Sequence, residues 1–159
     1  MRLKAVPPPP PSLDSLADIT EAAPLVPEPR ETFRSSLATR VEWISARESE
    51  AWLSLALALG LLREGESGIY RPGEAVAEGT VRERFVEGIY GVEEVLAALR
   101  ADGPLTSTAL ADRVPIPPWE RRHHADPEAV HRERIERLLG WLSLYGWVSY
   151  MSGSYHLRV

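Results

Sequence analysis

Apolar residues recur at helical spacing near the C-terminal end of the chain, and this pattern organises the interpretation of everything before it. Between residues 127 and 145 they return at intervals of three and four, as on one face of an α-helix. The stripe consists of Ile135, Leu138, Leu139, Leu142 and Tyr145. The pattern predicts one long helix with a single buried face.

Local signals mark both ends of this helix and the segment after it. Asp126 can accept a hydrogen bond as the N-cap residue, and Pro127 suits the first helical position. Gly146 is expected to stop the helix in a left-handed conformation. Residues 147–158 then read as two strands joined by a tight turn around Gly153. The chain therefore predicts a long helix that leads directly into a β-hairpin.

A second copy of this pattern occurs earlier in the chain. Ser45 and Glu48 have the spacing of a capping box and open a predicted helix to about residue 59. Gly60, Gly68 and Tyr70 then match Gly146, Gly153 and Tyr155 at an offset of about 86 residues. We interpret the chain as two copies of one unit, each ending in a helix and a hairpin.

Proline, glycine and capping residues divide the rest of the chain. A polyproline run at residues 7–11 predicts an extended arm, either a stiff spacer or a ligand for an aromatic groove in a partner protein. Residues 41–44 are expected to form a short strand or a connection between helices. Further helices are predicted over residues 12–23, 30–39, 80–90, 92–100 and 107–114, with a loop over 115–125.

These elements group into three regions and a linker. Residues 1–11 form a proline-rich N-terminal arm, 12–73 a first domain and 80–159 a second domain, with 74–79 between the two domains. A chain of 159 residues is long enough for two small domains of this kind. The expected fold class is mostly α with small β-hairpins, an α+β protein with two domains in tandem.

Composition narrows the classes of function. With no cysteine, the chain has no disulfide, thiolate or cysteine-zinc chemistry. The longest apolar run, residues 51–62, is too short to cross a bilayer, so we expect a cytoplasmic protein without a membrane partner. The net charge of −5 argues against DNA binding over the whole surface but leaves room for a local basic face.

The predicted order of elements in the second domain resembles a winged-helix domain, and the first domain resembles the same fold. The whole chain is also similar to a family of small halophilic-archaeal proteins to which the resemblance attaches no activity. That likeness is carried by the proline-rich start ahead of residues 24–27, by the block at 119–126 and by residues 138–141. It implies tandem winged helices. The winged-helix class implies a DNA-binding transcriptional regulator, with a protein-interaction adaptor that touches no DNA as the alternative.

One departure prevents the transfer of DNA contacts from the winged-helix class. A helix-turn-helix joins its helices by three or four residues, whereas about 12 residues separate Val114 from Asp126. Candidate contacts to double-stranded DNA are therefore chosen by chemistry, because arginine suits phosphate, tryptophan can stack and hydroxyls can reach the backbone. They are Trp119, Arg121, Arg122, His123, His124, Arg132 and Arg137, together with Ser152 and Ser154 in the hairpin turn.

Acidic residues compete for the same arginines. Glu128 and Arg132, like Glu133 and Arg137, have the i,i+4 spacing of stabilising helix ion pairs. A protein-binding or loop-packing role and a plain solvated face remain alternatives to DNA contact. A positive face uninterrupted by Glu120, Glu133 and Glu136 would favour nucleic acid.

The sequence offers less support for a metal site or a catalytic site than for a DNA contact. His123, His124, Asp126 and His131 match no zinc-binding spacing, and His131 is better explained as a half-buried histidine on the apolar stripe with its hydrogen bonds satisfied. The chain also has no glycine-rich phosphate loop, nucleophile elbow or paired catalytic carboxylates. We expect no enzyme activity, no metal and no cofactor.

The helix ending near Leu59 is more apolar than a groove-reading helix should be. We place Leu53 and Leu57 on its outward face, which would form an association patch if left in water. Its cover is expected to be the N-terminal segment, the second domain or a second chain. Trp52, Leu53 and Leu57 are therefore candidate interface residues of a homodimer, with a scaffold role for the first domain.

Overall fold

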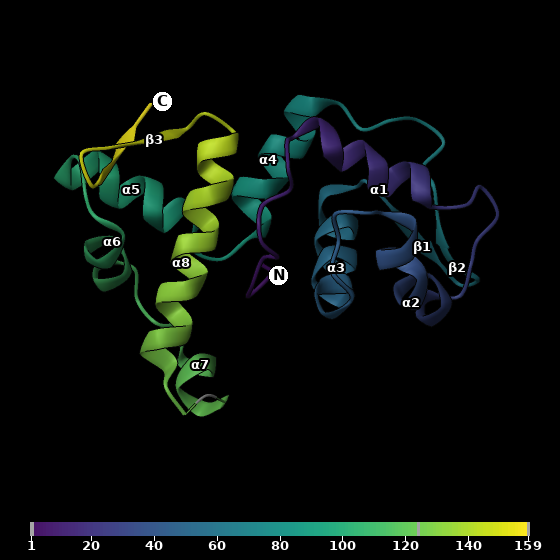
Figure 1. Cartoon of the computed structure of the whole chain (residues 1–159), viewed down its shortest axis with the longest axis horizontal. Helices are drawn as coiled ribbons and strands as arrows, with labels where there is room; N and C mark the ends of the chain where they lie inside the picture. Colours follow the sequence, from purple (N-terminus) through teal and green to yellow (C-terminus); the bar gives the residue numbers. More distant parts are fainter. Residues whose placement is uncertain (1, 124, 159) are drawn as a thin grey trace. The chain divides into compact units, whose positions relative to one another are not determined.

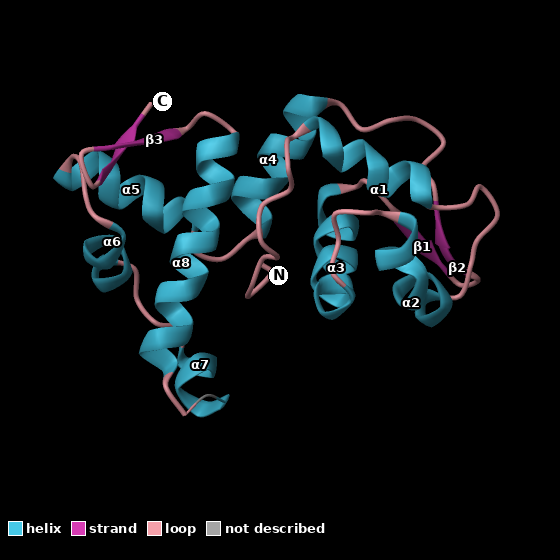
Figure 2. Ribbon diagram, in the orientation of Figure 1, coloured by secondary structure: helices cyan, strands magenta, loops and turns pink. Residues whose placement is uncertain are grey.

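The computed structural model describes residues 2–123 and 125–158, which fold into two compact units, Met1–Ile89 and Tyr90–Val159. Each unit combines helices with one two-stranded antiparallel hairpin (Figures 1 and 2). The fold is therefore mostly α with small β-hairpins, as the sequence predicted.

The first unit contains the following elements in chain order. They are η1 (Asp14–Leu16), α1 (Ala17–Ala22), α2 (Arg30–Arg40), η2 (Ala46–Glu48), α3 (Ser49–Leu59), β1 (Arg63–Gly65), β2 (Gly68–Tyr70) and α4 (Glu78–Gly88). The segment at residues 41–44 is a turn, which settles the choice between a strand and a connection.

The second unit has a similar order, with a helix inserted before its last helix and no described helix after its hairpin. Its elements are α5 (Val92–Asp102), α6 (Ser107–Arg113), α7 (Pro118–His123), α8 (Pro127–Leu144), β3 (Val148–Met151) and β4 (Ser154–Leu157). The expectation of a loop over 115–125 was therefore wrong in part. Residues 115–117 are not helical, but α7 follows them, because proline is accepted in the first turn of a helix.

Both hairpins form where the glycine and strand signals placed them. In the second unit Tyr150 faces Tyr155 across the ribbon, and the turn residues Ser152 and Gly153 have φ of 53° and 83°. Two positive φ values in a two-residue turn match the right-handed twist of the strands it joins. The antiparallel ribbon over residues 147–158 is confirmed.

A single residue adds a third strand to each ribbon, which the sequence analysis missed. Glu28 exchanges backbone hydrogen bonds with Ile69 (2.9 and 2.6 Å), and Leu105 exchanges them with Tyr155 (3.2 and 2.8 Å). Each bridge lies between the first and second helices of its unit. One bridging residue leaves no alternating pattern, so nothing in the sequence indicated it.

The bridges also correct the match within the hairpins. By hydrogen-bond register Ile69 is the counterpart of Tyr155, whereas the sequence comparison paired Tyr155 with Tyr70. The helices keep the offset of 86. The buried positions of α3 are 49, 52, 53, 55, 56 and 59, and the same offset maps them onto the buried positions 135, 138, 139, 141, 142 and 145.

This register overturns the predicted orientation of Leu53. Leu53 is the counterpart of Leu139, and both side chains are fully buried. The outward positions of α3 are Glu50, Ala51, Ser54, Leu57 and Ala58, which are exposed or partly exposed. Ala51, Leu57 and Ala58 on this outward side made the helix more apolar than a groove-reading helix, although only one face of it enters the core.

Helix α4 lies on the first unit, so the structure divides later than the expected boundary at residue 80. Val81 and Phe85 are buried, and α4 packs against α3. Arg84 Nη1 donates to the backbone oxygen of Leu59 (3.1 Å) and so satisfies a carbonyl at the C-terminal end of α3. The segment expected to open the second domain thus completes the first unit.

The proline-rich arm is also part of the first unit. Leu3 N donates to Gly88 O (2.6 Å), and Val6 and Pro7 are buried.

The capping box predicted at Ser45 did not form. Ser45 makes no side-chain capping bond, and the short 3-10 turn η2 precedes α3. The predicted helix start is nevertheless correct in position, because Ser45 is the N-cap residue of η2 and η2 leads directly into α3.

Candidate nucleic-acid interface

Helix α8 is built by the signals that predicted it. The Asp126 side chain accepts from Ala129 N (3.1 Å), and Pro127 occupies the first helical position. After the helix, Gly146 has a φ of 77°, in the left-handed region expected there. The first turns of α8 are therefore held in a defined position.

His131 ties α8 to the end of α6. Its side chain is 4% exposed, and its Nε2 lies 2.8 Å from Val114 O and 3.2 Å from Ala111 O. Because both partners are carbonyl oxygens, Nε2 must carry the proton and donate. The prediction of a hydrogen-bonded histidine on the apolar stripe is confirmed. Among the described residues no group of His, Asp or Glu side chains is arranged to hold a metal ion.

Helix α7 is anchored to the unit by side chains. Glu120 is 2% exposed and forms an ion pair with Arg134 of α8. Burial, followed by the nearby charge of Arg137, lowers the pKa of Arg134 from its ordinary value, which starts far above neutral. Trp119 packs edge-on against Tyr90 with ring centroids 5.4 Å apart, and Tyr90 OH donates to Pro115 O (2.9 Å).

Three of the candidate arginines are exposed on α7 and on the first turns of α8. Arg121 and Arg122 are exposed on α7, and Arg132 is exposed in the second turn of α8. None of the three forms an ion pair with a described residue. The expected pair between Glu128 and Arg132 is thus absent from the described part of the chain.

Arg137 is in a different state. It pairs with Glu133 at 3.3 Å, as the i,i+4 spacing predicted, and its side chain is three-quarters buried. Trp119, held against Tyr90, is half-buried, which limits its use as a stacking or inserting residue. His124 and the side chain of His123 lie outside the described residues; the backbone of His123 ends α7.

The hairpin candidates are not brought together with the arginines. Ser152 is exposed in the turn, and Ser154 is half-buried at the start of β4. Figure 1 shows α7 beside the N-terminal end of α8 and the hairpin at its other end. An 18-residue helix is about 27 Å long. The structure therefore separates two candidate contact regions within the second unit.

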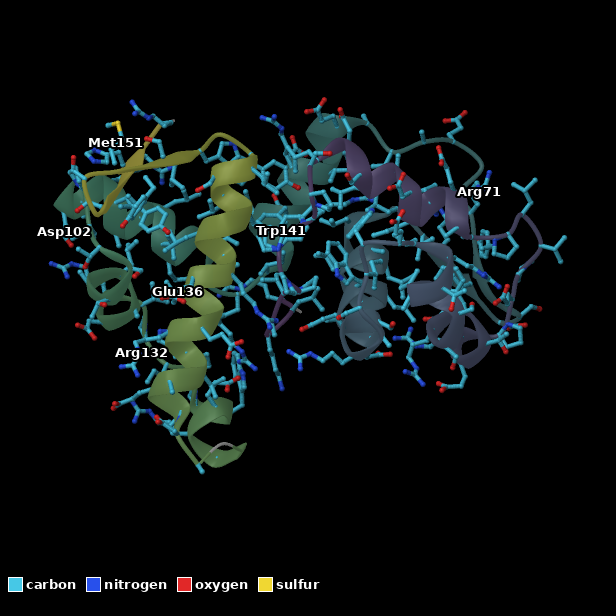
Figure 3. All side chains as sticks on the ribbon, viewed as in Figure 1. Arg71, Asp102, Arg132, Glu136, Trp141 and Met151 are labelled. Atoms are coloured by element: carbon cyan, nitrogen blue, oxygen red, sulfur yellow. The ribbon has the colours of Figure 1, made fainter. Side chains whose placement is uncertain are left out.

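Carboxylates limit the positive surface. Glu120 is buried in its pair with Arg134 and does not interrupt the surface, but Glu133 and Glu136 are exposed on α8. Figure 3 shows Arg132 and Glu136, which are one turn apart on this helix. Asp126 and Glu128 are also exposed at the start of α8, so the arginines of α7 and α8 do not form an uninterrupted positive face. Sequence reasoning missed Arg134, because only the fold brings it to Glu120.

The candidate interface of the first unit is covered by its own fold. Trp52 and Leu53 are 3% and 0% exposed, and only Leu57 is partly exposed. Helix α3 packs against α2, η2 and α4. The association patch inferred from Leu53 does not exist, because that side chain points into the core. The homodimer stays a prediction without this support.

Comparison with known proteins gives the same architecture. The model of one family, the halobacterial double winged helix domain, matches residues 1–158. No curated protein and no solved structure matches the chain. No helix in the described part of the chain combines the length and the hydrophobicity needed to span a membrane. In each unit, three helices, a one-residue strand and a hairpin follow in the winged-helix order, and the chain belongs to the halobacterial double winged helix domain family.

Proposed function

We propose that this protein is a DNA-binding transcriptional regulator that contacts the duplex through its second unit. The observation that carries the proposal is the group formed by Arg121, Arg122 and Arg132, three exposed guanidinium groups without an ion pair to any described residue. They lie on α7 and the first turns of α8, the third helix of the winged-helix order. Guanidinium groups bind phosphate with paired hydrogen bonds.

The contacts proposed for these arginines are mainly to phosphates. Glu133 and Glu136 are exposed farther along α8 and would be repelled by the charged backbone of DNA. Phosphate contacts position a protein on the duplex, whereas base contacts give specificity. The arginine group therefore supplies affinity and orientation, and Ser152 in the hairpin is proposed as a second, weaker backbone contact.

The first unit is proposed to act as a scaffold. At the offset of 86 residues, Ala46 stands at the position of Arg132 and Glu48 at the position of Arg134. The segment between α2 and α3 carries no counterpart of α7. The first unit also contains 14 carboxylates against 10 basic residues, compared with nine against eight in the second unit. Both features favour the second unit for nucleic acid.

The test is a salt titration of binding to labelled duplex DNA. Three phosphate contacts predict a slope of about −2.7 in a plot of log affinity against log salt. Affinity should then fall about 40-fold between 50 and 200 mM salt. The combined variant Arg121→Ala, Arg122→Ala, Arg132→Ala should remove most of this slope. Arg100→Ala, which removes an exposed arginine of α5, is the matched control and should leave it unchanged.

The rival proposal is a protein-interaction adaptor. It is favoured by two large apolar side chains at the hairpin of the second unit, Tyr150 and Met151, which are 62% and 47% exposed. Solvent-exposed apolar groups of this size are more typical of protein contacts than of phosphate contacts. If the protein shows no DNA binding that weakens with salt from 50 mM upwards, and the triple arginine variant does not change its binding, the regulator is excluded. The adaptor then remains.

A further inference from the structure

A small hollow lies beside the proposed DNA-contact group, within the second unit. Its volume is about 230 Å³, and its walls come from the end of α6, the connection to α7, α7 itself and the first turns of α8. A space of this size equals about seven or eight water molecules. It is smaller than the usual pocket for a drug-sized ligand and suits a molecule of about ten heavy atoms.

Charged groups of both signs converge on this hollow without neutralising one another. Arg121 and Arg132 contribute two guanidinium groups, and Asp112 and Glu128 contribute two carboxylates. No ion pair joins any of these four side chains to a described residue. Elsewhere in the unit arginines do pair, as Arg113 does with Asp102 (2.5 Å). All four residues are exposed, so a ligand in the hollow can reach two basic and two acidic residues.

The other residues that line the hollow are apolar, or their polar atom already has hydrogen-bond partners. Ala111, Val114, Pro115 and Ile116 line the hollow with carbon. His131 also borders it, but its Nε2 is engaged with the carbonyls of Ala111 and Val114. A ligand that fits would therefore carry a positive group, a negative group and a short apolar part.

We propose that this hollow binds a free α-amino acid with an aliphatic side chain. The ligand carboxylate would accept hydrogen bonds from Arg121 and Arg132, because guanidinium groups match carboxylate geometry. The ligand ammonium would donate to Asp112 and Glu128, and its side chain would lie against Val114 and Ile116. A simple carboxylic acid fits less well, because it offers no positive group to Asp112 and Glu128.

A bound amino acid would regulate DNA binding, and this part rests on the proposed function. Arg121 and Arg132 belong both to the hollow and to the proposed phosphate contacts, so the ligand and DNA compete for two of three guanidinium groups. Coupling between two ligands is reciprocal. The amino acid should weaken DNA binding, and DNA should weaken amino-acid binding by the same factor.

The first experiment measures ligand binding to the full chain without DNA. Leucine is titrated by calorimetry beside 4-methylpentanoate, which lacks the ammonium, and 3-methylbutan-1-amine, which lacks the carboxylate. Leucine should bind at least tenfold more tightly than either analogue. Valine, isoleucine and alanine are titrated in the same way. If none of the four amino acids binds or shifts the amide signals of Val114 and Ile116, the proposal is overturned.

The second experiment uses variants that leave the arginines in place. Asp112→Asn with Glu128→Gln should weaken leucine binding at least tenfold and leave the salt dependence of DNA binding in place. Glu93→Gln, an exposed carboxylate in the first turn of α5, is the control and should change neither. Unchanged leucine binding in the double variant would show that the ligand binds elsewhere.

Adding leucine to the DNA titration separates the two proposals. Leucine binding without any DNA binding supports the amino-acid site and refutes the DNA-binding function. DNA binding without amino-acid binding refutes the site and leaves the function. If both bind but saturating leucine does not weaken DNA binding, the regulatory role is overturned.

Discussion

The two units use one winged-helix plan but differ at the start of the third helix. In the first unit α3 begins at Ser49, after a short 3-10 turn. In the second unit α8 begins at Pro127, and the offset of 86 makes it eight residues longer at this end. The extra turns carry Arg132 and Arg134, and they are the part of the helix against which α7 docks.

The cores of the two third helices are the same by position. The six buried positions of α3 map without a shift onto five buried positions of α8 and its buried C-cap residue, Tyr145. A winged-helix unit therefore tolerates a change at the start of its third helix, because the buried stripe lies farther along. The comparison teaches that the shared stripe maintains the fold and that the added turns can be used for binding.

The largest expected effect tests the equivalence of the two buried stripes. Leu53→Ala and Leu139→Ala remove equivalent, fully buried side chains, so each should lower the free energy of unfolding by about 3–4 kcal/mol. Leu57→Ala, at a partly exposed position, should cost about 1 kcal/mol. Urea denaturation followed by tryptophan fluorescence measures all three. If Leu53→Ala lowers the free energy of unfolding by less than Leu57→Ala does, Leu53 lies at the surface and not in the core.

The two hairpins should respond differently to the loss of a glycine. Gly68 has a φ of 124°, and an added Cβ would lie 1.9 Å from Glu28 O, the acceptor in the bridge to Ile69. Gly68→Ala should therefore cost about 3 kcal/mol and break that bridge. Gly153 has open space around it, so Gly153→Ala should cost about 1 kcal/mol of backbone strain. Thermal unfolding gives the loss of stability in both variants. Equal losses would contradict the close approach of Gly68 to Glu28 O.

Helix α7 is held by a buried ion pair, whereas the pair between Arg30 and Glu64 in the first unit is exposed. Glu120→Ala leaves Arg134 partly buried without its partner and should cost about 2–3 kcal/mol, below the range for a fully buried pair because Arg134 is partly exposed. Glu64→Ala breaks an exposed pair with Arg30 (3.0 Å) and should cost about 0.5 kcal/mol. Hydrogen exchange of the α7 amides should accelerate only in Glu120→Ala. Unchanged exchange would mean that α7 is held by other contacts.

The smallest expected effect compares the two helix starts. Asp126 caps α8 through Ala129 N, so Asp126→Ala should cost about 1 kcal/mol. Ser45 makes no side-chain capping bond, and Ser45→Ala should stay within about 0.5 kcal/mol. Both are measured by denaturation under the same conditions. A clear cost at Ser45 would indicate that the predicted capping box forms in solution.

Part of the candidate site could be predicted because charged side chains are mostly exposed in folded proteins. Arg121, Arg122 and Arg132 follow a proline-rich loop or lie off the apolar stripe, and all three are exposed. The ion pair of Arg137 with Glu133 followed from their spacing, although its burial did not and the same spacing did not pair Arg132 with Glu128. The burial of Glu120 and the hollow beside Arg132 could not be predicted, because each joins residues from different elements.

The sequence by itself determined the helices other than α7, the two hairpins and the repeat that relates the units. Helical periodicity, the Asp126 cap and glycines such as Gly146 act over a few residues, so their outcome can be read locally. Only the tertiary structure decided that Leu53 points inward, that α4 completes the first unit and that α7 docks through Glu120. These depend on contacts between residues far apart in the chain, whose free energies no local pattern contains.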